Sequence, residues 1–399
     1  MQINLDGIKF YCGELMDMCL PARSIFDEQV CAFLDETAKL LLHDKAVRQY
    51  PDVMTFAFFC RKANIQQLAA RYEREKEERL GRGVAFHIAP SNVPINFAYT
   101  LVMGLLAGNA CIVKASSKDF VQTRLVTAAM REVLAREEFI SLRPYITVIA
   151  YPRERQDVTE ALSALCNVRI VWGGDETIKS VRQAPLAPRA LELTFADRYS
   201  LAVLEAGAVL QADLPRLAQD FYNDTYLYDQ NACSSPRLIY WLGDEQTVSQ
   251  AQQTFWQAVW ANIKDRYPVE PVVAVDKYLA ACRTGIELPG SCQEMMADNR
   301  IVRARVKELS GKLAGLRCAG GFFHEYVADS LEGLVLLADE RCQTVSYYGL
   351  EPQVLREFVL ERGLHGIDRI VPVGRTAEMG VVWDGQDFVL SLSRIVALT

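Results

Sequence analysis

The sequence lacks the features that would direct the protein into a membrane, onto nucleic acid or around a metal ion. Its longest apolar run, residues 101–113, is interrupted by two glycines and an asparagine. It is also shorter than the roughly 20 residues that a membrane-spanning helix needs. The formal net charge is −7, which argues against nucleic acid as the main partner. We therefore expect no membrane span and no nucleic-acid partner.

The eleven cysteines are scattered, and no two of them are separated by only two residues. This spacing predicts neither a zinc cluster nor a dithiol redox pair, so we expect no bound metal. The first nine residues show neither the basic start nor the apolar core of a signal peptide. We therefore expect a cytoplasmic protein whose cysteines stay reduced.

Composition and length indicate a folded protein of more than one domain. Half of the residues are hydrophobic and 23% are charged, which is ordinary for a globular chain. A length of 399 residues exceeds what a single hydrophobic core usually supports. We expect two domains and a small appendage.

The chain begins with a helical region and continues as an α/β pattern. Residues 22–80 are predicted helical, with the charged run 71–79 as a solvated helix face. Strands follow, alternating with helices, and this alternation predicts a parallel sheet covered on both faces. The expected strands are residues 84–88, 110–114, 146–150 and 168–172, and the expected helices are residues 95–107, 120–136 and 157–165.

A second α/β pattern starts near residue 205. Helices are predicted at residues 213–226, 245–265, 276–282 and 301–309. Strands are predicted at residues 334–338, 344–347 and 370–373, and the stretch 383–394 contains a turn followed by an alternating strand. The sequence therefore predicts two α/β domains in succession.

A polar loop, residues 228–237, ends in Cys233 and leads into an apolar stretch that begins at Leu238. A strand entered in this way can hold a loop rigidly, with the cysteine facing a cleft. Free cysteine is also often a small buried hydrophobe. The stretch by itself favours a packing residue slightly over a nucleophile.

Two glycines, Gly173 and Gly174, follow Trp172 and precede a short predicted helix. Glycines between a strand and a helix can let a phosphate approach the backbone N–H groups. An ordinary turn between strand and helix has the same sequence. This turn alone therefore does not define a cofactor site.

Taken in order, these motifs resemble the aldehyde dehydrogenase superfamily. Pro-Ser-Asn-Val-Pro at residues 90–94 precedes an apolar helix, Gly108-Asn109 leads to a strand ending in Lys114, and Asp-Gln-Asn-Ala-Cys ends at Cys233. Within that superfamily the chain looks most like the LuxC acyl-CoA reductases, from about residue 83 to the C-terminus. The stretches that carry this likeness are residues 87–94, 230–237, 341–345, 366–374, 383–385 and 392–394.

The resemblance implies a role for each candidate residue. Cys233 would be the nucleophile, and Asn92 would donate to the oxyanion of the tetrahedral intermediate. Lys114 would contact the adenosine ribose of a nicotinamide cofactor, and the turn 172–174 would lie by its pyrophosphate. Each residue also has an ordinary interpretation, Asn92 as a turn residue and Lys114 as a solvated charge.

Cofactor preference is predicted from the residues that follow Lys114. NAD-preferring relatives commonly place a glutamate three residues further on, where this chain has Ser117 followed by Lys118. Serine and lysine can donate to a 2′-phosphate that a carboxylate would repel. With Arg153 and Arg155 expected nearby, we predict that NADPH is used at least as well as NADH.

The chain departs from the superfamily pattern at two places. Hydrolytic relatives place a water-activating glutamate in Glu-Leu-Gly-Gly-Lys, whereas residues 191–198 contain Glu192 but no glycine pair. The segment that usually holds the nicotinamide ribose is also missing, and by resemblance residues 342–345 take its place. We therefore expect slow hydrolysis of an acyl-enzyme.

The sequence predicts an α/β protein with the aldehyde dehydrogenase architecture, comprising a doubly wound cofactor-binding domain and a second α/β catalytic domain. The expected domains are residues 1–205, residues 206–384 with Cys233, and a C-terminal strand, residues 385–399. The resemblance implies an active site in the cleft between the two domains and a homo-oligomer whose interface includes that strand.

The expected function is NADPH-dependent reduction of an acyl-CoA or acyl thioester to an aldehyde through an S-acyl-Cys233 intermediate. The resemblance also implies a partner, an acyl-protein ligase that activates the free acid. Three alternatives stay open: an aldehyde-oxidising dehydrogenase of the same fold, a cysteine acyltransferase or thioesterase that uses no nicotinamide, and a non-catalytic scaffold.

Overall fold

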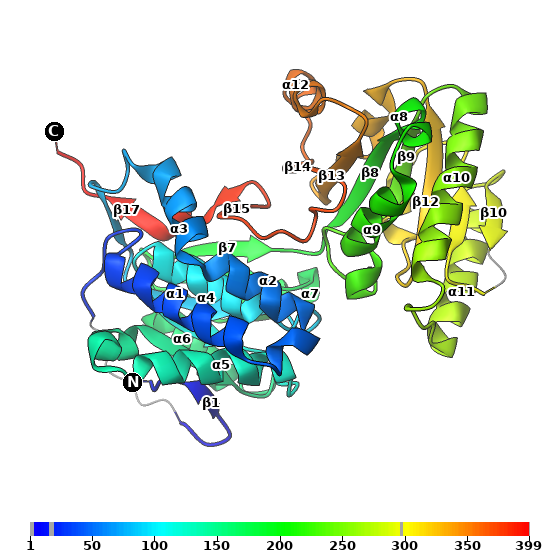
Figure 1. Ribbon diagram of the computed structural model, residues 1–399. Coiled ribbons are helices and arrows are strands. Elements are labelled where there is room, and N and C mark those ends of the chain that lie inside the picture. The colour runs from blue at the N-terminus through cyan, green and yellow to red at the C-terminus, as the bar shows by residue number, and fades with distance from the viewer. Residues whose placement is uncertain (1–3, 16–19, 296–297, 399) are drawn as a thin grey trace. The chain divides into compact units, whose positions relative to one another are not determined.

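The computed structural model describes residues 4–15, 20–295 and 298–398. The chain forms two compact units (Figure 1). Unit 1 comprises residues 1–196 and 379–399, and unit 2 comprises residues 197–378. Within the described ranges, none of the helices combines the length and apolar character needed to cross a bilayer.

Unit 1 is built on a six-stranded sheet in the order β1-β5-β4-β3-β6-β7. Only β1 is antiparallel to its neighbour, and the other strands run parallel. The strands are β1 (Lys9–Cys12), β3 (Val84–Ile88), β4 (Ala110–Lys114), β5 (Ile146–Ala150), β6 (Val168–Trp172) and β7 (Leu191–Phe195). The first parallel strand along the chain is the central β3. The chain then winds outward through β4 and β5, and returns past β3 to β6 and β7.

Helices cover both faces of this sheet, and each face has its own apolar core. One core joins the sheet to the N-terminal helices and to the two helices that follow β3 and β4. They are α1 (Glu28–His43), α2 (Pro51–Cys60), α3 (Lys62–Ala69), α4 (Asn96–Leu106) and α5 (Val121–Leu134). The other core packs α6 (Gln156–Leu165) and α7 (Asp175–Val181) against the opposite face. Strands buried on both faces explain the continuous apolar runs at residues 84–88 and 146–150.

The C-terminal residues complete unit 1. α13 (Phe388–Leu392) packs into its main core, and β17 (Ser393–Ile395) pairs with β2 (Arg79–Gly81). The Tyr72 hydroxyl donates to the Asp387 carboxylate at 2.8 Å. The alternating strand predicted here is therefore one helical turn followed by a three-residue strand, because the large apolar side chains fill the core of unit 1.

Unit 2 contains a seven-stranded sheet in the order β10-β11-β12-β9-β8-β13-β14. β10 is antiparallel to its neighbour, and the remaining strands are parallel. The strands are β8 (Tyr199–Glu205), β9 (Pro236–Leu242), β10 (Cys292–Met295), β11 (Val302–Arg305), β12 (Phe322–Ala328), β13 (Cys342–Tyr348) and β14 (Arg369–Pro372). The predicted fold, a doubly wound sheet followed by a second α/β unit, is thus confirmed.

Three apolar clusters flank the sheet of unit 2. α8 (Ala206–Leu210), α9 (Leu214–Asp224) and α10 (Glu245–Ile263) pack on one face, with aromatic contacts such as Phe221–Phe255. α12 (Pro352–Arg362) and η6 (Leu331–Leu336) contribute to the cluster on the other face. A small cluster joins α11 (Pro271–Glu287) to β11 and β12.

Three further secondary-structure predictions are wrong. Residues 301–309 contain β11 rather than a helix, because parallel pairing with β12 outweighs the helical spacing of their apolar side chains. Residues 334–338 lie at the end of a 3₁₀ helix and not in a strand. The helix predicted to run to residue 80 ends with α3 and a short 3₁₀ turn, and the charged run that follows forms turns.

The structure draws the boundary between the units at residues 196 and 197, nine residues before the position expected from the sequence. The reason is β8, which pairs with β9 and β13 inside unit 2. The chain leaves unit 2 at Glu378, so residues 379–384 belong with the C-terminal segment in unit 1. Unit 2 is thus an insertion in unit 1.

Candidate active site

Unit 1 has a pocket of about 420 Å³ at the carboxyl ends of its parallel strands. The chain winds away from β3 in both directions, and ligands of open α/β sheets bind where the winding reverses. Loops after β3, β4, β5 and β6 supply the walls. All six residues predicted in unit 1 line this pocket, namely Asn92, Lys114, Ser117, Trp172, Gly173 and Gly174.

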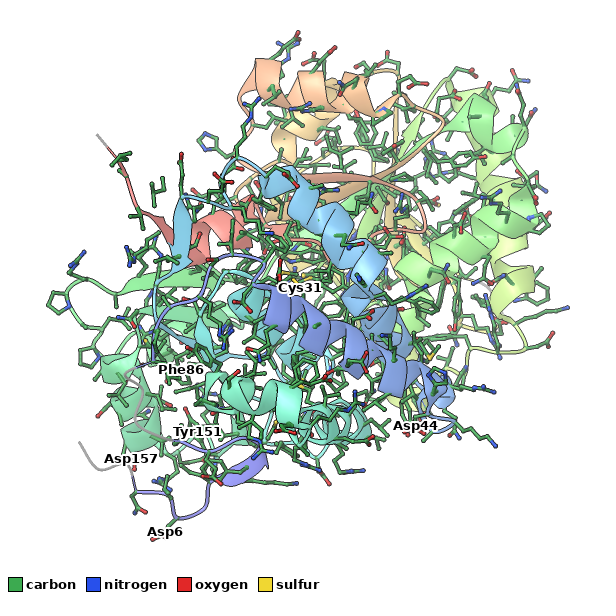
Figure 2. The ribbon with its side chains drawn as sticks, turned by 60° about the vertical axis from the view of Figure 1, so that its left-hand side comes forward. Asp6, Cys31, Asp44, Phe86, Tyr151 and Asp157 are labelled. Carbon is green, nitrogen blue, oxygen red and sulfur yellow. The ribbon has the colours of Figure 1, made fainter. Side chains whose placement is uncertain are left out.

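Lys114 is the last residue of β4, and its aliphatic stem is largely enclosed. Its Nζ lies 4.9 Å from the ring centroid of Tyr151, which follows β5 and is labelled in Figure 2. Burial lowers the pKa of Lys114, and the positive charge of Arg153 lowers it further. A bound anion or a ribose hydroxyl would offset this cost, so the position suits a cofactor contact.

Two hydroxyls and a guanidinium give the pocket donors for a phosphate. Ser116, Ser117 and Arg153 line it. Arg155, which we expected nearby, is instead engaged elsewhere: its guanidinium pairs with Asp157 at 2.8 Å and donates to the backbone of the N-terminal loop. These contacts join Arg155 to the N-terminal loop and to the start of α6.

The turn after β6 lines the pocket with Trp172, Gly173 and Gly174. The Trp172 ring stacks on Phe195, with centroids 4.0 Å apart, and its Nε1 donates to the Thr100 hydroxyl at 3.1 Å. A Cβ at Gly174 would meet no atom within 4 Å, so this backbone is open to a ligand. A Cβ at Gly173 would lie 3.0 Å from Thr177.

Thr100 also contacts His87, whose Nδ1 lies 2.7 Å from the hydroxyl oxygen. His87 is fully buried on β3, and burial lowers its pKa to about 3. A neutral imidazole that fills a strand position has no catalytic role here. His87 is therefore a core residue of β3.

Asn92 lies on the loop after β3 and is exposed at the mouth of the same pocket. Within the described part of the chain its side-chain amide makes no hydrogen bond. A solvent-facing amide of this kind is available as a donor to a ligand.

Cys233 lies in unit 2, on the loop that enters β9. Two residues in this loop, Asp229 and Gln230, have left-handed backbone conformations with φ of 51° and 57°. The Gln230 side chain, which is completely buried, stabilises this strained backbone. Its Nε2 donates to the carbonyls of Pro236 and Phe322 at 3.0 Å, and its Oε1 accepts from the N–H groups of Gly321 and Phe322.

The backbone of Cys233 is tied to the neighbouring strands. The Ser200 hydroxyl on β8 donates to the Cys233 carbonyl at 2.8 Å and accepts from the Thr344 N–H on β13 at 3.2 Å. The Gln343 amide donates to Cys233 Sγ at 3.3 Å, and Gln343 itself is 1% exposed. The half-buried thiol thus has a positioned hydrogen-bond donor.

A cation lies close to this loop. Arg237, the second residue of β9, donates to the Cys318 carbonyl. Burial lowers the pKa of its guanidinium to about 10, as does the positive charge of Arg317, so it stays protonated at neutral pH. This half-buried guanidinium interacts electrostatically with Cys233.

Most other cysteines are unsuited to nucleophilic chemistry. Burial raises the pKa of Cys12 and Cys31 to about 11 and that of Cys166 and Cys342 to about 12. It raises the pKa of Cys60 and Cys111 further still. These groups remain thiols at neutral pH, so they act as packing residues.

Glu192 is held away from a role as base by two arginines. Arg169 pairs with its Oε2 at 2.5 Å, and Arg182 pairs with its Oε1 at 2.7 Å. Glu192 lies opposite Arg169, near the amino end of β6. The pocket described above lies at the other end of that strand.

Within the described residues there is no cluster of histidine, cysteine and carboxylate side chains able to bind a metal ion. The sequence reasoning missed two contacts of the site, those of Gln343 and Ser200. Gln343 lies in the stretch 341–345 that carries the family likeness, so a signal existed for its importance. No feature of the sequence indicated its contact with the Cys233 thiol.

The fold is that of the aldehyde dehydrogenases. The chain resembles 1-pyrroline-5-carboxylate dehydrogenase of Thermus thermophilus with a TM-score of 0.59 and 14% identity, over 91% of this chain and 76% of that one. It resembles a lactaldehyde dehydrogenase with a TM-score of 0.60 and 14% identity, over 86% of this chain and 78% of the other. At these identities the likeness establishes the architecture alone.

The chain belongs to the LuxC acyl-CoA reductase family, which it matches over residues 26–281. The matched region begins well before residue 83, where we expected the likeness to start, so the helices α1 to α3 are part of it. Cys233 and all six candidate residues of unit 1 lie inside it. The stretches 341–345 and 366–374 lie beyond its end.

Among similar proteins is the long-chain acyl-protein thioester reductase of Aliivibrio fischeri, 30% identical over 165 residues. The protein of the same description from Vibrio harveyi is 28% identical over 166 residues. Each match covers 41% of this chain and 33% of the relative. The aligned region thus spans about a third of the length of these relatives.

Proposed function

We propose that this chain reduces an activated acyl group, supplied as an acyl-CoA or another acyl thioester, to an aldehyde with NADPH through an S-acyl-Cys233 intermediate. The observation that carries the proposal is the Gln343 amide directed at the thiol of Cys233, on a loop braced by a fully buried glutamine. Such a support keeps the sulfur in place during acyl transfer.

The proposed reaction begins with attack of the Cys233 thiolate on the thioester carbonyl. The leaving thiolate, such as that of coenzyme A, takes up a proton, and the acyl group remains on Cys233. The tetrahedral oxyanion in this step needs fixed N–H donors. We assign one of them to the side-chain amide of Asn92.

The residues of unit 1 fit a nicotinamide cofactor. Lys114 would hold the adenosine ribose, and Ser117 with Arg153 would donate to a 2′-phosphate. The turn at Gly173 and Gly174, whose backbone is open at Gly174, would face the pyrophosphate. When bound, NADPH supplies the hydride that converts the acyl group into the aldehyde. NADH can occupy the same pocket without using the phosphate donors.

Two observations favour this function over its alternatives. An aldehyde-oxidising enzyme must hydrolyse its acyl intermediate, but both oxygens of Glu192 are paired with arginines. A thioesterase or acyltransferase needs no dinucleotide site, yet one pocket of unit 1 is lined by five candidate cofactor residues, Lys114, Ser117, Trp172, Gly173 and Gly174. By family resemblance, an acyl-protein ligase that activates the free acid is a candidate partner.

The test is mass spectrometry of the protein after incubation with acyl-CoAs of different chain lengths. We expect one acyl group on the peptide that contains Cys233 and its loss as aldehyde when NADPH is added. An acyl label on another cysteine would contradict the assignment of the nucleophile. Labelling of Cys233 without aldehyde formation would favour the acyltransferase alternative.

A further inference from the structure

α11 presents an exposed apolar stripe to solvent. The side chains of Val272, Val275, Leu279 and Ile286 are 64%, 57%, 48% and 76% exposed, and Cys282 is exposed between them. Soluble proteins rarely leave so many large apolar side chains together in water unless the surface binds something. We call these five residues the α11 stripe; α11 is labelled in Figure 1.

The spacing of the α11 stripe is that of a coiled coil. Its residues follow one another at intervals of three, four, three and four, which places them at successive a and d positions of a heptad. The opposite side of the helix packs within the chain. Its buried residues are Lys277, Ala280, Ala281 and Thr284. α11 therefore has two contact faces, and only one of them is used within the chain.

We propose that the α11 stripe is a self-association surface, on which α11 of a second copy of this chain packs antiparallel across a two-fold axis. A two-fold interface requires a self-complementary surface, because every contact between two residues occurs twice. In one antiparallel register Val275 packs with Ile286 of the second copy, and Leu279 packs with Cys282 of the second copy. The two-fold axis repeats both layers.

The charges beside the stripe select this register. Asp276 and Arg283 occupy the e positions and are exposed, and neither forms an ion pair within the described residues. In the proposed register Asp276 of each copy faces Arg283 of the other, which gives two ion pairs. A shift by one heptad would place the two Asp276 carboxylates against each other, which is repulsive.

The g positions fit the same register. Tyr278, 59% exposed, would cover Gly285 of the second copy. A Cβ at Gly285 would meet only the side chain of Gln293, at 3.4 Å, so the helix surface there is open enough to receive a ring. The shifted register would instead set the two tyrosines against each other. Shape and charge thus favour one arrangement.

The first test is the solution mass of the purified chain by sedimentation equilibrium, without substrate or cofactor. We expect a dimer that Ile286→Glu converts to a monomer. The matched control is Leu360→Glu on α12, whose side chain is 68% exposed and should leave the dimer intact. A monomeric wild type, or a dimer that withstands Ile286→Glu, would overturn the proposal.

The second test is charge reversal. Asp276→Arg and Arg283→Asp should each raise the dimer dissociation constant by about tenfold or more, because like charges then face each other. The double reversal should return it to within about threefold of the wild type. Failure of the double variant to recover would overturn the proposed register.

The third test is disulfide crosslinking under mild oxidation with peptide mapping. Leu279→Cys should form a link to Cys282 of the second copy, whereas Val272→Cys should not. A link from the Val272→Cys variant would indicate the shifted register, and a dominant link between two Cys282 residues would indicate parallel helices. None of these measurements involves Cys233, so they stand or fall independently of the proposed reaction.

Discussion

The side-chain amide of Gln343 donates to the thiol of Cys233 across 3.3 Å, although 110 residues separate the two in the chain. Parallel strands bring them together, because β8 lies between β9 and β13 and the Ser200 hydroxyl bridges their ends. Cys233 is thus held by contacts with neighbouring strands and not by its own loop alone.

Replacing Gln343 should therefore slow chemistry at Cys233 without removing it. We expect Gln343→Ala to reduce the rate of Cys233 alkylation by iodoacetamide at neutral pH by about tenfold, since a hydrogen bond to a charged group contributes about 1.5–3 kcal/mol. The matched control is Gln252→Ala, which removes a buried amide of unit 2 on α10. Equal alkylation rates in wild type and Gln343→Ala would show that the contact has no influence on the thiolate.

Cys233→Ala should abolish both acyl-enzyme formation and aldehyde production, because no other described cysteine has the same support. NADPH binding should survive, since the proposed pocket belongs to unit 1. Titration of cofactor fluorescence measures the binding. Cys318→Ala, which removes the half-buried thiol beside Arg237, is the control and should retain activity. Turnover by Cys233→Ala would disprove the nucleophile.

Asn92→Ala should lower kcat by roughly two to three orders of magnitude, the usual cost of losing one oxyanion donor. The melting temperature should hardly change, because Asn92 is exposed and its amide makes no hydrogen bond within the described residues. Ser91→Ala, on the same loop, controls for loop disturbance. Near-normal turnover of the Asn92 variant would return this residue to the role of a turn former.

The wild type should use NADPH at least as well as NADH in initial-rate measurements. Ser117→Glu should shift the ratio of kcat/KM values toward NADH by about tenfold or more, because a carboxylate there repels a 2′-phosphate. Lys118→Ala is the control, since Lys118 does not line the pocket, whereas Ser117 does. A wild type with strong NADH preference would contradict this assignment.

An acyl-enzyme formed without cofactor should persist until NADPH or an incoming thiol is added. A thioester hydrolyses quickly only when a positioned base activates water, and Glu192 is occupied by Arg169 and Arg182. The decay can be followed by mass spectrometry before and after addition of NADPH. Release of free acid as fast as aldehyde forms would favour the oxidising alternative.

The sequence predicts four of the six strands in the sheet of unit 1 at their observed bounds, but it predicts neither of the edge strands, β1 and β7. The strands at 84–88 and 110–114 are mostly apolar runs between polar or glycine-containing loops, a pattern that burial on both faces favours. Residues 301–309 show the limit of such reasoning. Their apolar spacing fits a helix, and only pairing with β12, which lies further along the chain, makes them a strand.

One part of the candidate site can be predicted from the sequence, and the other part cannot. The pocket of unit 1 follows from local signals, because each of its loops comes directly after a recognisable strand. The surroundings of Cys233 depend on contacts between distant segments, such as Gln230 with Phe322 and Ser200 with Thr344. A single sequence carries no record of which strands become neighbours.

The insertion of unit 2 has a consequence for synthesis on the ribosome. The main core of unit 1 includes Phe388 and Leu392, and Asn109 donates to the Leu392 carbonyl at 3.0 Å. These residues are translated after residues 197–378, which emerge earlier as one continuous segment. We expect unit 2 to fold first and unit 1 to close only after residues 379–398 have emerged. A nascent chain arrested before residue 379 should therefore leave unit 1 sensitive to protease while unit 2 resists it.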